Sequence, residues 1–75
     1  MALIDITTEV AGTIWRIEVR AGQAVEVDDA LLLVESMKME IPVCAPRAGI
    51  VQELVVAEAD IVAEGDVVLR MDCEA

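Results

Sequence analysis

The sequence contains no histidine, no phenylalanine and no tyrosine. Because imidazole is missing, zinc sites built on histidine and histidine-based catalytic triads are excluded. The two cysteines, Cys44 and Cys73, are far apart and match no metal-binding spacing. We interpret both as small apolar residues in a reducing compartment, and a Cys44–Cys73 disulfide stays open as the alternative.

Positive charge is also scarce, since five Lys and Arg face fifteen Asp and Glu, for a net charge of -10. Nucleic acid is therefore a poor partner, because phosphate binding needs clustered basic residues. The dispersed acids fit a solvated surface that keeps the protein monomeric, and they also fit steering toward a basic partner. No basic N-terminal segment is present, and the longest apolar run is only Ala30 to Val34. We expect a cytoplasmic protein with no signal peptide and no membrane contact.

The sequence contains one lysine, Lys38, which carries the only side-chain amine. It lies in the segment Glu35-Ser36-Met37-Lys38-Met39-Glu40, near the middle of the 75 residues. Such a chain can be acylated at one side chain only, so Lys38 is the first candidate for a modification site.

Short Val- and Ile-rich runs, interrupted by turn residues every eight to twelve positions, predict one small all-β domain over residues 1–75. No window shows a sustained helical period. The expected strands are 3–7, 13–20, 24–27, 31–36, 39–44, 50–57, 61–63 and 67–72.

An internal repeat predicts the architecture, because residues 11–35 match residues 48–72 at an offset of 37. The matches include Ala11-Gly12 with Ala48-Gly49, Val19 with Val56, Val25 with Val62, Asp29 with Asp66 and Leu32 with Leu69. Both copies break the two-residue strand period at the same place, between Ile14 and Ile17 and between Val51 and Leu54, which indicates a bulge or sharp bend in each. We expect a flattened barrel of two four-stranded antiparallel sheets related by a pseudo-two-fold axis.

The join between the two copies is the dipeptide Met37-Lys38, which has to turn the chain between two apolar strands. Lys38 is therefore predicted at the tip of a two-residue hairpin. Such turns favour Asn-Gly or Asp-Gly, because both central residues need a positive φ. A local rule broken at an exposed point is typical of a functional site.

The segment around Lys38 closely resembles the biotin attachment motif of biotinyl domains, Glu-Ala-Met-Lys-Met. The flanks agree: Gly65-Asp66 and the segment from Ala45-Pro46 to Gly49-Ile50 match family turns at the expected spacing. The resemblance covers nearly the whole chain and implies a biotin carboxyl carrier. A biotin protein ligase would attach biotin to Lys38, and the group would then carry carboxylate from a biotin carboxylase to a carboxyltransferase. The carrier itself would not be an enzyme.

The resemblance also suggests roles for the neighbours of Lys38 in recognition by the ligase: Met37, Met39, Glu35 and Ser36. Core filling is the alternative for the two methionines, although a hairpin tip should leave at least Met37 near solvent. A plain surface role is the alternative for Glu35 and Glu40. Ser36 replaces the common Ala with another small residue.

Three departures from the family pattern affect turns, not the lysine. Glu9 stands where Pro is common, and Asp28 and Ala59 replace glycines. If those glycines have positive φ, Asp28 is tolerable and Ala59 is strained. Only residues 20–23 are expected between the second and third strands, so the protruding thumb of some bacterial carriers is absent. The chain thus resembles a thumbless biotinyl domain, either free-standing or excised from a larger carboxylase.

Two related readings and one unrelated reading compete with a biotin carrier. A lipoyl domain shares the fold and the lysine hairpin, but it usually has Asp-Lys-Ala around the target; a small member could also accept both groups. An unmodified lipoyl-like module of a transport adaptor has no reason to keep Met-Lys-Met. An enzyme in its own right is the weakest reading, because no nucleophile–base pair and no phosphate-binding loop is present.

Overall fold

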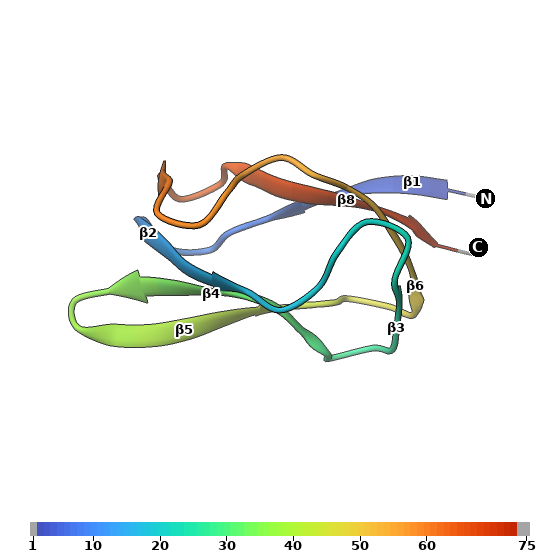
Figure 1. Ribbon diagram of the computed structural model, residues 1–75, viewed down its shortest axis with the longest axis horizontal. Coiled ribbons are helices and arrows are strands. Elements are labelled where there is room, and N and C mark those ends of the chain that lie inside the picture. Colours follow the sequence, from blue (N-terminus) through green and yellow to red (C-terminus); the bar gives the residue numbers. More distant parts are fainter. Residues whose placement is uncertain (1, 74–75) are drawn as a thin grey trace.

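The computed structural model describes residues 2–73, and all regular structure in that range is β-strand, which confirms the all-β prediction (Figure 1). The elements are β1 (Ala2–Thr7), β2 (Gly12–Ile17), β3 (Ala24–Val25), β4 (Ala30–Ser36), β5 (Met39–Cys44), β6 (Gly49–Leu54), β7 (Ile61–Val62) and β8 (Val67–Cys73).

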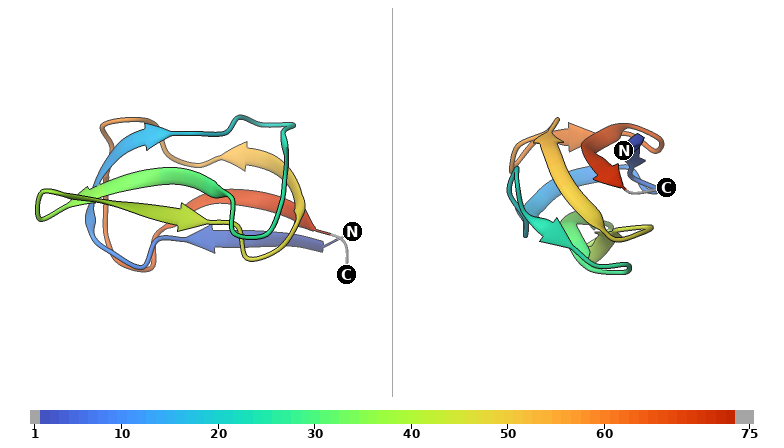
Figure 2. Two further views of the ribbon diagram at one scale, coloured as in Figure 1. Left: turned by 90° about the horizontal axis from the view of Figure 1, so that it is seen from below. Right: turned by 90° about the vertical axis from the view of Figure 1, so that its right-hand side faces the viewer.

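The strands form two four-stranded antiparallel sheets, in the orders β1-β8-β6-β3 and β5-β4-β2-β7. The sheets face each other and curve into a flattened barrel, as the end-on view in Figure 2 shows. Its principal extents are 36 × 17 × 17 Å. This is the predicted architecture of two sheets.

The pseudo-two-fold relation extends over all eight strands, beyond the residues in which the sequence repeat is visible. Each strand of the second half begins and ends 37 residues after its mate: Ala2–Thr7 corresponds to Met39–Cys44, and Ala30–Ser36 to Val67–Cys73. Cross-strand bonds repeat as well. The backbone N–H of Glu18 donates to Leu31 O at 2.9 Å, and that of Val55 donates to Val68 O at 2.9 Å. The two halves therefore share their hydrogen bonding as well as their outline.

A β-bulge lies in each half where the strand period breaks. The register of β2 against β4 shifts between Ile14 and Arg16, and that of β6 against β8 shifts between Val51 and Glu53. The extra residues, Trp15 and Gln52, are again 37 positions apart (52 − 15). The bulge prediction is confirmed in both copies.

Two strands are shorter than predicted, again symmetrically. The expected strands 13–20 and 50–57 end at Ile17 and Leu54, so six residues (18–23), not four (20–23), join β2 to β3. Both extensions keep one buried or half-buried valine, Val19 or Val56, although they have left the sheet. Apolar alternation thus continued past the end of the regular ladder, through segments that keep one backbone bond to the neighbouring strand, at Glu18 and at Val55, before they leave it. The short strands β3 and β7 also end before the expected residues 27 and 63.

The core lies between the sheets and draws on both halves. Eight of its fully buried members form matched pairs: Ile14 and Val51, Leu31 and Val68, Leu32 and Leu69, Val34 and Met71. Since each half has only one apolar face, neither could bury it without the other.

Four tight turns close the ends of the barrel, each with a residue at positive φ. These residues are Gly22 (91°), Asp28 (70°), Ala59 (76°) and Gly65 (89°). Asp28 and Ala59 thus adopt the conformation that the missing glycines would have had. In three of the turns an aspartate accepts a hydrogen bond from a backbone N–H three residues earlier, as Asp60 does from Ala57 at 2.9 Å.

The β4–β5 hairpin and the two ends of the described chain lie at opposite ends of the barrel (Figure 1). The pseudo-two-fold axis exchanges them: Ser36 pairs with Met39 beside the hairpin, and Cys73 pairs with Ala2 at the far end. Only one end of the barrel is therefore closed by Met37-Lys38.

Candidate functional site

The tip of the β4–β5 hairpin consists of Met37 and Lys38 alone, as predicted. Their φ angles are 52° and 64°, the pattern of a type I′ turn. Each non-glycine residue in this region costs about 1–2 kcal/mol relative to an ordinary backbone conformation. The two strands, which pair from Ser36–Met39 to Ala30–Cys44, hold the turn in place against that cost.

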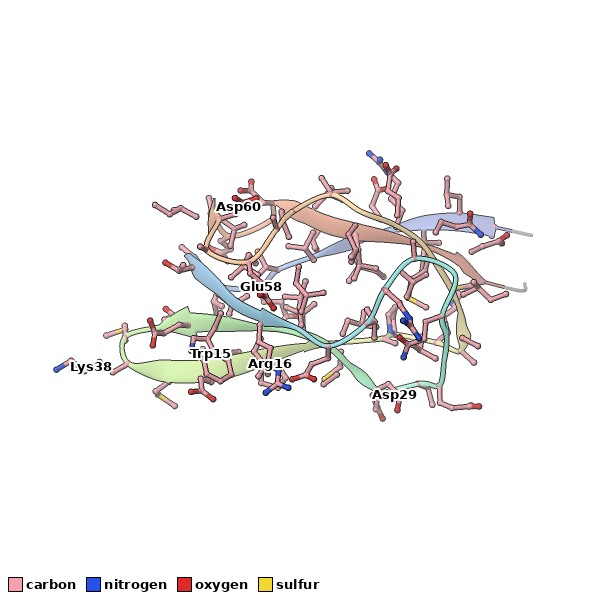
Figure 3. The ribbon with its side chains drawn as sticks, in the orientation of Figure 1. Trp15, Arg16, Asp29, Lys38, Glu58 and Asp60 are labelled. Atoms are coloured by element: carbon pink, nitrogen blue, oxygen red, sulfur yellow. The ribbon has the colours of Figure 1, made fainter. Side chains whose placement is uncertain are left out.

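The side chains at the tip project away from the barrel. Lys38 extends into solvent beyond the end of both sheets (Figure 3), while Met37 is 92% exposed and Met39 is 63% exposed. Core filling is therefore wrong for both methionines. The amine stands on a rigid base, and two flexible apolar side chains lie beside it for a partner to contact.

Two carboxylates face each other just behind the tip. Glu35 on β4 and Glu40 on β5 are cross-strand partners, and both are exposed. Like charges directly opposite each other weaken a strand pair. Among residues 2–73 neither forms an ion pair. Ser36, between Glu35 and the turn, is half-buried. The hairpin thus presents one cation at its tip and two anions behind it, and the recognition roles of these residues stay predictions.

A further acid contacts the same sheet at the end of β2. The Glu58 carboxylate, from the segment after β6, accepts a hydrogen bond from the Ile17 backbone N–H at 3.1 Å. Sequence reasoning missed this contact, because the two residues are 41 positions apart and no local pattern joins them. Trp15, the bulged residue, is 45% exposed.

Both cysteines are free in the structure, with no disulfide between Cys44 and Cys73. Cys73 is buried as a small apolar residue, whereas Cys44 is exposed at the end of β5. Within residues 2–73 no group of three or more acidic or cysteine side chains could hold a metal ion. The same residues include no helix long and apolar enough to cross a membrane.

The fold and the tip together define a class of protein: a flattened β-barrel domain that displays one lysine on a two-residue hairpin. The sequence profile of a family described as "Biotin-requiring enzyme" matches residues 3–71. The chain belongs to this family, the biotin/lipoyl attachment domains.

Individual relatives agree with the family. The chain is 44% identical to a biotin/lipoyl attachment protein of Bacillus subtilis, over 91% of this chain and 93% of that protein. It is 39% identical to "Biotinylated protein TB7.3 homolog" of Mycobacterium leprae, over 85% of this chain and 90% of that one. Both relatives are small proteins of similar length.

Among solved structures, the urea carboxylase of Kluyveromyces lactis contains a similar domain. The TM-score is 0.90 at 28% sequence identity, and the match covers 96% of this chain and 6% of the carboxylase chain. The two-sheet fold predicted from the sequence is thus the fold of a domain found in a biotin/lipoyl-family structure.

Proposed function

We propose that the protein is a biotin carboxyl carrier with Lys38 as the attachment residue. The observation that carries the proposal is the placement of the only lysine at the tip of a type I′ hairpin, between two exposed methionines. The biotinylated relative from M. leprae and the likeness to a urea carboxylase support biotin as the group.

The residues at the tip fit this group. A biotin protein ligase would join the biotin carboxyl group to the Lys38 ε-amine as an amide, and this replaces an ammonium charge by a neutral group. When bound, biotin supplies a ureido ring that accepts and releases carboxylate. The hairpin holds the attachment point clear of the barrel, and Met37 and Met39 offer adaptable contacts to the ligase. Glu35 and Ser36 would complete the recognised segment.

The partners follow from this role. A biotin carboxylase would load the group and a carboxyltransferase would unload it, while the carrier adds no catalytic residue. Attachment to a carrier turns delivery into a step at high effective concentration. We further propose that residues 1–75 act as one cytoplasmic domain, monomeric in isolation, whose acidic surface of net charge -10 meets basic surfaces on these partners.

Co-expression with a biotin protein ligase tests the proposal. Intact-mass spectrometry should find one biotin per chain, and a streptavidin blot should be positive. Lys38→Arg keeps the charge but removes the acceptor amine, so its modification should be abolished completely. Its circular dichroism spectrum should be unchanged, because the tip contributes little burial. A biotinylated Lys38→Arg protein would rule out this attachment site.

A lipoyl carrier, or an acceptor of both groups, is the second candidate, because the B. subtilis relative is named for both attachments. Parallel co-expression with a lipoyl ligase distinguishes the two. The lipoyl mass increment on Lys38, without the biotin increment in the matched experiment, would contradict a biotin carrier and establish the alternative.

A further inference from the structure

A pocket of about 320 Å³ opens between the two sheets on the side of the barrel where β1 and β5 form the sheet edges. Thr7, Glu9 and Val10, at the end of β1 and in the loop after it, form one wall, and residues 41–44 of β5 form the other. We call this the β5 pocket. We propose that it is a binding site for the acyl group on Lys38, in which the arm rests against its own carrier.

The pocket lies within reach of the arm because β5 begins immediately after Lys38. A strand rises about 3.3 Å per residue, so Ile41 and Pro42 lie about 10 and 13 Å from Lys38 along β5. The lysine side chain followed by a five-carbon acyl chain has about eleven bonds of about 1.5 Å, and in a zigzag these span about 14 Å. An arm folded back along β5 would place its terminal ring beside Pro42 and Val10.

The chemistry of the lining suits an uncharged ring with N–H donors. Val10 and Ile41 are partly buried apolar side chains, and Pro42 is exposed beside them. Glu9 brings a carboxylate and Thr7 a hydroxyl, both of which can accept hydrogen bonds from a ureido group. A carboxylated ring is anionic, and the Glu9 carboxylate would repel it. The pocket would therefore hold the unloaded arm in preference to the loaded one.

Tethering makes even a weak site effective. A ligand on a short flexible linker has an effective concentration of roughly 1 mM, so a site with a dissociation constant of about 1 mM would be half occupied. The proposal rests on the proposed function only for the identity of the acyl group.

Cys44 provides a reporter, because it lines the pocket and is exposed, while Cys73 is buried. The rate at which iodoacetamide alkylates Cys44 is compared between unmodified protein and protein carrying biotin on Lys38. A half-occupied pocket should slow the reaction about two-fold. Equal rates would overturn the proposal.

The biotinyl form does not depend on a ligase. A chain of 75 residues can be assembled by chemical synthesis with biotinyl-lysine at position 38. Failure of the ligase experiment and failure of the pocket experiment are thus distinguishable. Protein bearing acetyl-lysine at position 38 has the same charge as the biotinyl form but lacks the arm, and its Cys44 should react as in unmodified protein.

Two further controls separate the pocket from general effects. In a Cys44→Ser background, Leu3→Cys places a thiol at an exposed position on β1, away from the pocket, and its rate should not respond to biotin. Glu9→Ala should reduce the protection of Cys44, whereas Glu26→Ala, at an exposed acid outside the pocket, should leave it unchanged. Slowing by acetylation alone, or equal slowing at positions 3 and 44, would refute binding of the arm in the pocket.

Discussion

The outer faces of the two sheets occupy equivalent positions in the fold, yet they carry different chemistry. On the sheet β1-β8-β6-β3, Arg70 bridges two acids: its Nε donates to Asp5 Oδ1 at 3.0 Å and a terminal nitrogen donates to Glu53 Oε1 at 2.6 Å. The equivalent residues on the lysine-bearing sheet, 37 positions away, are Leu33 for Arg70, Pro42 for Asp5 and Arg16 for Glu53. There the bridge is replaced by apolar side chains and one arginine.

This difference teaches which features the fold requires and which it leaves free. The central core positions stay apolar in both halves, as Leu32 and Leu69 or Val34 and Met71 show. Gly12 and Gly49, which lie close to the backbone of a neighbouring strand, recur in both halves, and so do the turns with positive φ. Divergence is concentrated on the surface and at the two ends: where one sheet carries the Arg70 bridge, the lysine-bearing sheet carries Leu33, Pro42 and Arg16. The predictions below test how far the equivalence between the halves extends.

The largest effect is expected at the matched glycines of β2 and β6. A Cβ on Gly12 would overlap the Glu35 carbonyl oxygen, and one on Gly49 would lie 2.6 Å from that of Asp72. Gly12→Ala should lower the free energy of unfolding by about 3 kcal/mol and Gly49→Ala by about 2 kcal/mol, since backbone has to move in both cases. Denaturant unfolding measures both. An unchanged free energy of unfolding in only one of the two variants would show that the close backbone contacts at Gly12 and Gly49 are not equivalent.

A smaller change in the free energy of unfolding is expected at the matched turns of Gly22 and Ala59. Here removing a side chain, in Ala59→Gly, should stabilise the protein. Ala59 has a φ of 76° where its mate Gly22 has 91°, and nothing lies within 4 Å of a Cβ built on Gly22. Ala59→Gly should raise the free energy of unfolding by about 0.5–1 kcal/mol, and Gly22→Ala should lower it by about 1 kcal/mol. Thermal unfolding of the two variants tests this. Destabilisation by Ala59→Gly would mean that the Ala59 methyl group makes a stabilising contact.

The smallest effect is expected at the ion bridge. Hydrogen bonds to Glu53 and then to Asp5 raise the pKa of Arg70 above its usual range. A raised pKa means that the contribution of the Arg70 charge is fully present at neutral pH and is lost as strongly alkaline pH removes the guanidinium proton. Arg70→Leu, which makes the position resemble Leu33, should lower the melting temperature slightly, because exposed ion pairs contribute little.

Salt dependence provides the control for that variant. The difference in melting temperature between Arg70→Leu and the parent should shrink toward zero at about 1 M salt, where charges are screened within roughly 3 Å. Arg16→Leu, which removes one longer ion pair with Glu18 at 3.5 Å, should change the melting temperature less. An effect of Arg70→Leu that persists at high salt would point to packing of its aliphatic stem.

Much of this fold could be predicted because local and repeated patterns agree. The hairpin at Met37-Lys38 followed from its two flanking strands, and the bulges at Trp15 and Gln52 followed from a phase break that appears twice. The predicted ends of β2 and β6 were wrong for a physical reason. Val19 and Val56 continue the apolar alternation because it records burial, whereas a strand also requires a hydrogen-bonded neighbour.

Features that join distant segments were not predictable in this way. The bond from Ile17 to Glu58 depends on how one half packs on the other, and the β5 pocket arises where the loop after β1 meets Pro42. Neither leaves a periodic trace in the sequence. The proposal that Lys38 is the attachment residue, by contrast, came from its motif and its uniqueness, and the structure adds the conformation of the turn that presents it.

The pairing of Ala2 with Cys73 has a mechanical consequence. These residues lie side by side at the end of the barrel remote from Lys38 (Figure 1), and the long axis measures 36 Å. If that end were held in place, a small rotation of the barrel about it would move the Lys38 amine over a much larger distance than the residues near the held end. The displacement of the amine would then depend on the stiffness of the body, which its two sheets set.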